Sequence, residues 1–142
     1  MHLYQRTLRQ SVRCEGIGLH SGKTVHLTIK PAPTNHGIRF VRVDLPGTPG
    51  VTGQFNRVVD TSLATVIGSD GCIVSTIEHL MATFAGRSID TALVELDAYE
   101  LPVMDGSAGP FTTLITESGI EDQGVPRHFF TLKEPIELTD GD

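Results

Sequence analysis

The hydrophobic periodicity of this 142-residue chain changes at Ser75, and this change constrains the fold more than any other feature. Before Ser75, apolar and polar residues alternate, as over residues 24–30, which is typical of strands with one buried face. After Ser75, apolar residues recur at every third or fourth position, which indicates one face of a helix. That face consists of Ile77, Leu80, Met81, Phe84 and Ala85. We therefore expect strands followed by a helix over residues 75–86.

The same patterns predict the remaining elements. A second helix is expected over residues 110–118, because Pro110 suits a first helical position and Gly119 a helix end. Strands are expected over residues 12–17, 24–30, 38–43, 58–67, 72–74, 92–96, 129–132 and 136–138. The predicted fold is α+β, with a mostly antiparallel sheet packed on one face by two helices. Residues 1–142 would form one domain.

The charge and composition exclude several classes of function. The chain has 11 Lys and Arg against 17 Asp and Glu, a net charge of −6, so we expect no nucleic-acid partner. No apolar run approaches the roughly 20 residues that cross a membrane, so the chain is not expected to span one. Cys14 and Cys72 form no CxxC pair, which favours a reducing, cytoplasmic setting.

The segment Ser75-Thr-Ile-Glu-His79 holds the densest group of residues able to carry chemistry. Glu78 follows Ser75 by three positions, so the pair matches a capping box, which is a purely structural role. His79 lies about 170–200° from the centre of the apolar face, so it faces solvent, another segment or a ligand. A carboxylate beside an imidazole also suits a general base beside a metal ligand. The helical HExxH pattern is absent because residue 82 is Ala, so further ligands would have to come from other segments.

Two loops contain other polar candidates. His20 lies in the glycine-containing loop of residues 16–22, which is not a GxGxxG motif because the third glycine falls one residue late. A histidine in such a loop is more often a structural hydrogen-bonding residue than a catalytic one. In the loop of residues 101–109, we expect Asp105 and Ser107 to organise a turn.

Five segments, in this order, resemble the bacterial zinc enzymes named UDP-3-O-acyl-N-acetylglucosamine deacetylases. They are Gln5-Arg-Thr-Leu8, Gly16-Ile-Gly-Leu-His-Ser-Gly22, Leu27-Thr-Ile-Lys-Pro-Ala-Pro33, Ser75-Thr-Ile-Glu-His-Leu80 and Leu101-Pro-Val-Met-Asp-Gly-Ser-Ala-Gly-Pro-Phe111. The resemblance implies removal of the N-acetyl group from a UDP-linked acylated N-acetylglucosamine, the committed step of lipid A synthesis. It also implies two domains of similar α+β topology with the active site between them. This chain would be the N-terminal domain, without the C-terminal one.

Matched by position, the resemblance implies that Glu78 is the general base and His79 the first of three zinc ligands. It further implies that Leu63 and Ala64, on a strand edge, line the substrate site and that His20 lies near it. The other two ligands, a His and an Asp, and a general-acid His belong to the family's second domain. We therefore expect residues 1–142 alone to fold, to bind zinc weakly or not at all, to be inactive, and to expose a domain interface available for self-association. The alternative is a non-catalytic binding or assembly module with the same fold.

Overall fold

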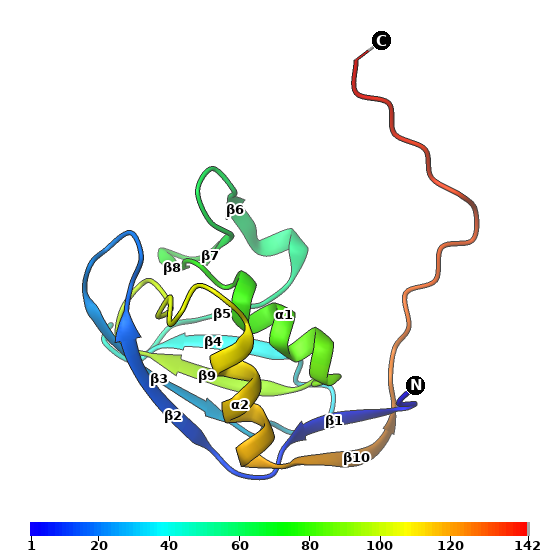
Figure 1. Cartoon of the computed structure of the whole chain (residues 1–142), viewed down its shortest axis with the longest axis horizontal. Helices are drawn as coiled ribbons and strands as arrows, with labels where there is room; N and C mark the ends of the chain where they lie inside the picture. The colour runs from blue at the N-terminus through cyan, green and yellow to red at the C-terminus, as the bar shows by residue number, and fades with distance from the viewer. Residues whose placement is uncertain (142) are drawn as a thin grey trace.

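The computed structural model describes residues 1–141, which contain ten strands, one 3₁₀ helix and two α-helices (Figure 1). The strands are β1 (Tyr4–Leu8), β2 (Val12–Ile17), β3 (Thr24–Lys30), β4 (Ile38–Arg42), β5 (Gly50–Thr52), β6 (Val58–Asp60), β7 (Val66–Ser69), β8 (Cys72–Val74), β9 (Ala92–Leu96) and β10 (Ile120–Pro126). The helices are η1 (Phe55–Arg57), α1 (Glu78–Arg87) and α2 (Gly109–Ser118). None of the helices in residues 1–141 is long and apolar enough to cross a membrane.

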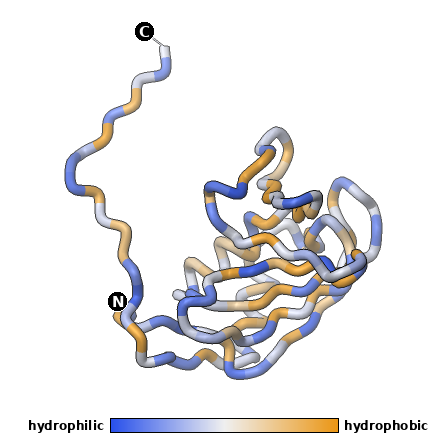
Figure 2. Tube along the Cα trace, turned by 180° about the vertical axis from the view of Figure 1, so that it is seen from behind, coloured by the Kyte–Doolittle hydropathy of each residue, from blue (hydrophilic) through white to orange (hydrophobic). Residues whose placement is uncertain are grey.

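The main sheet has the strand order β2-β3-β9-β4-β5, and both α-helices lie over the same face of it (Figure 1). Only the β4–β9 pair is parallel; the other pairs are antiparallel. The alternating residues of β3 and β9 that face the helices are buried, and the other face carries polar groups such as the Lys30–Glu95 ion pair. This alternation of hydropathy along the strands is visible in Figure 2. The predicted α+β fold is confirmed, and β9 forms the middle strand of this sheet.

A second sheet, β6-β7-β8, forms a small lobe beside the main sheet (Figure 1). A tight turn joins β7 to β8, with Asp70 and Gly71 both at positive φ. The predicted continuous strand over residues 58–67 is wrong, because Asp60 Oδ1 accepts both the N–H and the hydroxyl of Ser62. These bonds turn the chain into a loop over residues 61–65, between β6 and β7.

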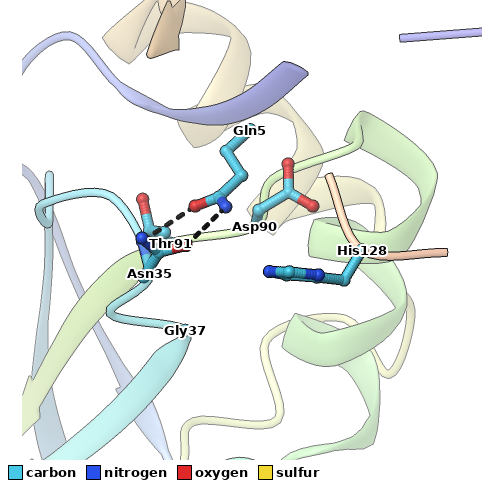
Figure 3. Close-up of a pocket in the computed structure, with 6 residues that line it drawn as sticks. All are labelled: Gln5, Asn35, Gly37, Asp90, Thr91 and His128. Atoms are coloured by element: carbon cyan, nitrogen blue, oxygen red, sulfur yellow. Dashed lines mark hydrogen bonds between the residues drawn. The ribbon is translucent and has the colours of Figure 1, made fainter. Parts of the chain in front are cut away.

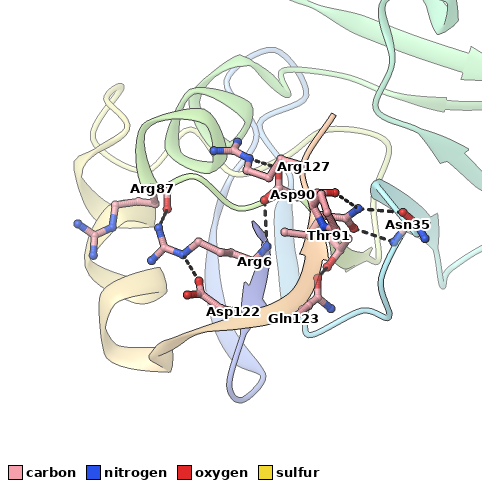
Figure 4. A network of polar contacts seen from close by, with 10 residues as sticks. Arg6, Asn35, Arg87, Asp90, Thr91, Asp122, Gln123 and Arg127 are labelled. Carbon is pink, nitrogen blue, oxygen red and sulfur yellow. Dashed lines mark hydrogen bonds and ion pairs between the residues drawn. The ribbon is translucent and has the colours of Figure 1, made fainter. Parts of the chain in front are cut away.

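The third sheet pairs β1 with β10, two strands that the hydrophobic pattern does not predict. Asp90 joins it to the rest of the fold, because its carboxylate accepts the Arg6 N–H at 2.9 Å and pairs with Arg127 at 2.8 Å (Figure 4). A polar cavity of about 260 Å³ lies nearby, where the Gln5 side chain exchanges two hydrogen bonds with Asn35 (Figure 3). It contains none of the predicted site residues.

Residues 127–141 leave this sheet as an extended segment (Figure 1). The strands predicted over residues 129–132 and 136–138 are therefore wrong for the part of the chain that the structure describes. A strand requires a neighbour to share its backbone hydrogen bonds, and no described strand lies against these residues.

Both helices differ from prediction at their ends. Helix α1 begins at Glu78 rather than Ser75, and it continues through Gly86 to Arg87. The chain leaves α1 at Ser88, which has a φ of 56°, and the N–H of Ile89 donates to Phe84. Helix α2 begins one residue earlier than expected and ends at Gly119 as predicted.

Candidate active site

The Glu78 side chain does not form the predicted capping box. Its Oε2 accepts the backbone N–H of Thr65 at 3.0 Å, and α1 has no side-chain cap. The backbone N–H of Ser75, which a capping box would direct at Glu78, donates instead to the carbonyl of Tyr99 at 2.7 Å. The structural explanation for Glu78 is thus wrong, and its carboxylate is directed at the loop between β6 and β7.

Glu78 lines a cavity of about 230 Å³ whose walls are otherwise apolar or uncharged. The large apolar side chains that line it are Phe55, Val58, Ile67, Ile77 and Met81. Glu78 is the one ionisable side chain among the described residues that line this cavity. The cavity therefore places one carboxylate, held by a single N–H, against a hydrophobic surface.

His79 follows Glu78 in the first turn of α1. Its ring atom Nδ1 is buried and has no hydrogen-bond partner within residues 1–141. A buried polar nitrogen normally has a partner, since an unpaired one costs about 1–3 kcal/mol. His79 is therefore a side chain whose hydrogen-bonding or ligating capacity the described chain leaves unused.

The loop of residues 105–109 lies close to His79. Hydrogen bonds from Ser107 lower the pKa of Asp105, and the nearby His79 lowers it further. These bonds confirm that Asp105 and Ser107 organise a turn. The hydroxyl of Thr83, one turn along α1, reaches the carbonyl of Ala108 at 3.2 Å and joins the loop to the helix.

Residues 1–141 contain no group of three or more His, Cys, Asp or Glu side chains able to hold a metal ion. The His79 imidazole, with the Glu78 carboxylate beside it, could supply one ligand of a metal site. The described residues do not supply the remaining ligands. Three protein ligands are usual in a catalytic zinc site. Any such site would need ligands from outside the described residues.

The structure brings His20, Leu63 and Ala64 together around a second cavity of about 390 Å³. Leu63 and Ala64 were expected on a strand edge. They lie instead in the loop of residues 61–65. The same loop lines both cavities, because Ala64 lines the second and Thr65 the first. His20 is exposed, and its backbone N–H donates to Glu100 Oε1 at 3.0 Å.

With this geometry established, comparison with known proteins decides the family. Residues 5–142 match the family model of LpxC, UDP-3-O-acyl N-acetylglycosamine deacetylase. This chain belongs to that family. The resemblance inferred from the five sequence segments is confirmed.

Similar relatives named UDP-3-O-acyl-N-acetylglucosamine deacetylase come from several bacteria. The one from Chromohalobacter salexigens is 51% identical over 132 residues, which cover 93% of this chain and 44% of the relative. The one from Myxococcus xanthus is 49% identical, with 97% of this chain and 44% of the relative covered. That from Xanthomonas oryzae pv. oryzae is 44% identical, with 97% and 46% covered. The chain thus spans about half the length of these relatives.

Sequence reasoning missed Glu100, which connects two of the motifs by which the deacetylase family was recognised. Its carboxylate is fully buried and accepts hydrogen bonds from the loop of residues 16–22 and from Thr76. Gly18 is the sequence signal that could have indicated it, because a Cβ at Gly18 would lie 2.5 Å from Glu100 Oε2. A glycine alone, however, does not identify its neighbour in space.

Proposed function

We propose that residues 1–142 form the N-terminal domain of a zinc-dependent deacetylase. The reaction is hydrolysis of the N-acetyl group of UDP-3-O-acyl-N-acetylglucosamine in lipid A synthesis. Membership of the family supports this assignment, as do the names of the relatives. Relatives about twice as long as the matched segment are consistent with a second domain that completes the site. The two unpaired thiols, Cys14 and Cys72, agree with a cytoplasmic location.

One observation carries the proposal. The Glu78 carboxylate is not used to cap its own helix, and the next residue has a buried imidazole nitrogen without a partner. A capping box explains neither feature, whereas a general base next to a metal ligand accounts for both. We therefore assign Glu78 as the general base and His79 as one zinc ligand.

The chemistry follows from these assignments. A bound zinc ion supplies polarisation of the amide carbonyl and lowers the pKa of water. Glu78 accepts a proton from the attacking water, whose oxygen bonds to the acetyl carbon. The carbon–nitrogen bond then breaks, acetate leaves, and the sugar nitrogen gains a proton to become a free amine. The Thr65 N–H orients Glu78 by occupying Oε2, so Oε1 is left to take the proton.

The second cavity is the proposed contact surface for substrate. His20, Leu63 and Ala64 line it, and it adjoins the Glu78 cavity through the loop of residues 61–65. Several large apolar side chains nearby are exposed, among them Phe55 and Leu63 at 92% and 82%. Exposed apolar groups of this size mark a surface that another domain covers. Without that domain, the surface is available for self-association.

The test uses a completed enzyme, made by joining residues 1–142 to the remaining length of the Chromohalobacter relative. Acetate release from UDP-3-O-acyl-N-acetylglucosamine and zinc content are measured together. Glu78→Gln should retain zinc and lose activity by two or more orders of magnitude, about the contribution of a general base. His79→Ala should lower zinc affinity itself.

Glu95→Gln is the matched control, because Glu95 lies on the opposite face of the sheet in an ion pair with Lys30. It should retain both zinc and activity. Near-normal turnover in Glu78→Gln would contradict the assignment of the base. A folded, zinc-loaded, completed enzyme without activity would favour the non-catalytic module instead.

A further inference from the structure

Glu100 is fully buried, yet no cationic side chain of residues 1–141 pairs with it. Its carboxylate accepts the N–H of His20 at 3.0 Å, the N–H of Ser21 at 2.8 Å and the hydroxyl of Thr76 at 3.1 Å. None of the ion pairs within residues 1–141 includes Glu100. Burial raises the pKa of this carboxyl, but the hydrogen bonds outweigh burial and hold the pKa below its ordinary value. Glu100 is thus a buried carboxylate anion stabilised by uncharged donors alone.

Ion pairing gives no reason for a charge at this position. The other buried charged side chain, Arg42, is paired with Asp44, as is usual for buried charges. A buried carboxylate without a cation is costly, and a neutral residue would fill the same space. The reason for Glu100 therefore lies in what its three donors have in common.

Two of those donors belong to the loop that carries His20. This loop is closed by hydrogen bonds between Gly18 and Lys23 and between Gly22 and Gly18. It is packed directly on Glu100, since a Cβ at Gly18 would lie 2.5 Å from Oε2. The backbone N–H groups of His20 and Ser21 consequently point inward at the carboxylate, which fixes the position of His20.

The third donor, Thr76, lies two residues before Glu78 and three before His79. Its φ is 60°, a left-handed conformation that a β-branched residue adopts rarely and only under external constraint. Glu100 supplies that constraint through the Thr76 hydroxyl. Ser75 adds backbone bonds on either side of Glu100, to Tyr99 at 2.7 Å and from Leu101 at 3.1 Å. The turn that leads into α1 is therefore held against Glu100.

We propose that Glu100 is a positioning residue of the active site. Its carboxylate joins the His20 loop to the turn before α1, and so sets where His20 stands relative to Glu78 and His79. This inference rests on the proposed function for its catalytic consequence. The link between the loop and the turn is a separate statement that can be tested without catalysis.

The catalytic test compares three variants in the completed enzyme. Glu100→Gln keeps the volume of the side chain but removes the charge and one acceptor oxygen, and Thr76→Val removes only the hydroxyl. Thr7→Val is the control, because the buried Thr7 hydroxyl makes a comparable tie, to Thr91 and Ala32, outside the proposed site. We expect Glu100→Gln to lower kcat/KM by about 10- to 100-fold, as loss of a group that orients an active-site residue does. Thr76→Val should also lower kcat/KM. Thr7→Val should keep kcat/KM within about twofold of the parent, even where it lowers the Tm as much as Glu100→Gln or more.

The structural test uses the 142-residue chain and amide NMR. Glu100→Gln should shift the amide signals of His20 and Ser21 and also those of Glu78 and His79, with faster hydrogen exchange at both places. Thr7→Val should leave these four signals unchanged. Unchanged Glu78 and His79 signals in Glu100→Gln, or a loss of kcat/KM no larger than in Thr7→Val, would overturn the proposal.

The outcomes separate the two proposals. If the completed enzyme is inactive but Glu100→Gln still shifts the amide signals of both the His20 loop and the turn before α1, the proposed function is refuted. The link between the loop and the turn then remains established. If Glu100→Gln gives no dispersed spectrum, Thr76→Val is judged by the same signals and the same rate criterion.

Discussion

Replacing Gly18 with alanine tests the contact between the His20 loop and Glu100 by steric means alone. The added Cβ would lie 2.5 Å from Glu100 Oε2 and would overlap Ser21 Oγ. Ordinary contacts begin near 3.4 Å, so one partner would have to move by roughly 0.9 Å. Glu100 cannot swing away, because it is fully buried and held by three donors. Overpacking of this kind costs about 1–3 kcal/mol, which corresponds to a fall of about 3–10 °C in Tm for a domain of this size.

The assay is thermal and urea unfolding of the 142-residue chain, with Gly86→Ala as the matched control. A Cβ at Gly86 meets no atom within 4 Å, and Gly86 lies exposed in α1. Alanine is the better helix former there, so Gly86→Ala should stabilise the fold by about 0.5–1 kcal/mol. The same substitution is thus expected to have opposite signs at the two glycines. A Gly18→Ala variant as stable as the parent chain would show that the loop does not rest on Glu100 as described.

Three further outcomes are expected. Phe84→Ala, which empties a buried position of α1, should destabilise the chain by about 3–5 kcal/mol in urea unfolding, and a loss under 1 kcal/mol would contradict the helix packing. The hydrogen bond and charge of Asp97 raise the pKa of His26 from 6.5, so their stabilisation is complete below pH 6.5 and is lost as pH rises through the raised pKa. His26→Gln should therefore flatten the pH dependence of Tm above pH 6, and an unchanged profile would refute it. Isothermal titration of residues 1–142 should show weak or no zinc binding, and the chain should not deacetylate the substrate, because His79 is a single ligand. Tight zinc binding that His79→Ala abolishes, together with turnover, would overturn this prediction.

Two competing contacts decide between the explanations that the sequence left open for Glu78. Ser75 and Glu78 have the spacing of a capping box, and local sequence offers no reason to reject it. The structure rejects it because the Ser75 N–H bonds to Tyr99 and the Glu78 carboxylate bonds to Thr65. Both partners come from other segments of the chain. A motif states which bonds a segment can make, and packing decides which of them it does make.

Much of the fold was predictable because hydrophobic period reports burial directly. Strands β2, β3 and β9 and helix α2 lie where alternation or helical spacing predicts them, since each has one face that must leave water. The hydrophobic period does not predict β1 and β10, which are strands because they pair with each other. It wrongly predicts strands within residues 129–138, which have no neighbouring strand among the described residues. Pairing is a property of two segments, and the period of either one does not contain it.

The sequence by itself determined the family, the α+β class and the adjacent pair of Glu78 and His79, because these depend on residue identity and on order along the chain. Only the tertiary structure decided which residues surround this pair and which hydrogen bonds hold them. Glu100 meets His20 and Ser21 across 80 and 79 positions and Thr76 across 24. A buried carboxylate is satisfied by whichever donors the fold delivers to it. The partners of Glu100 therefore became visible only once the chain had folded around it.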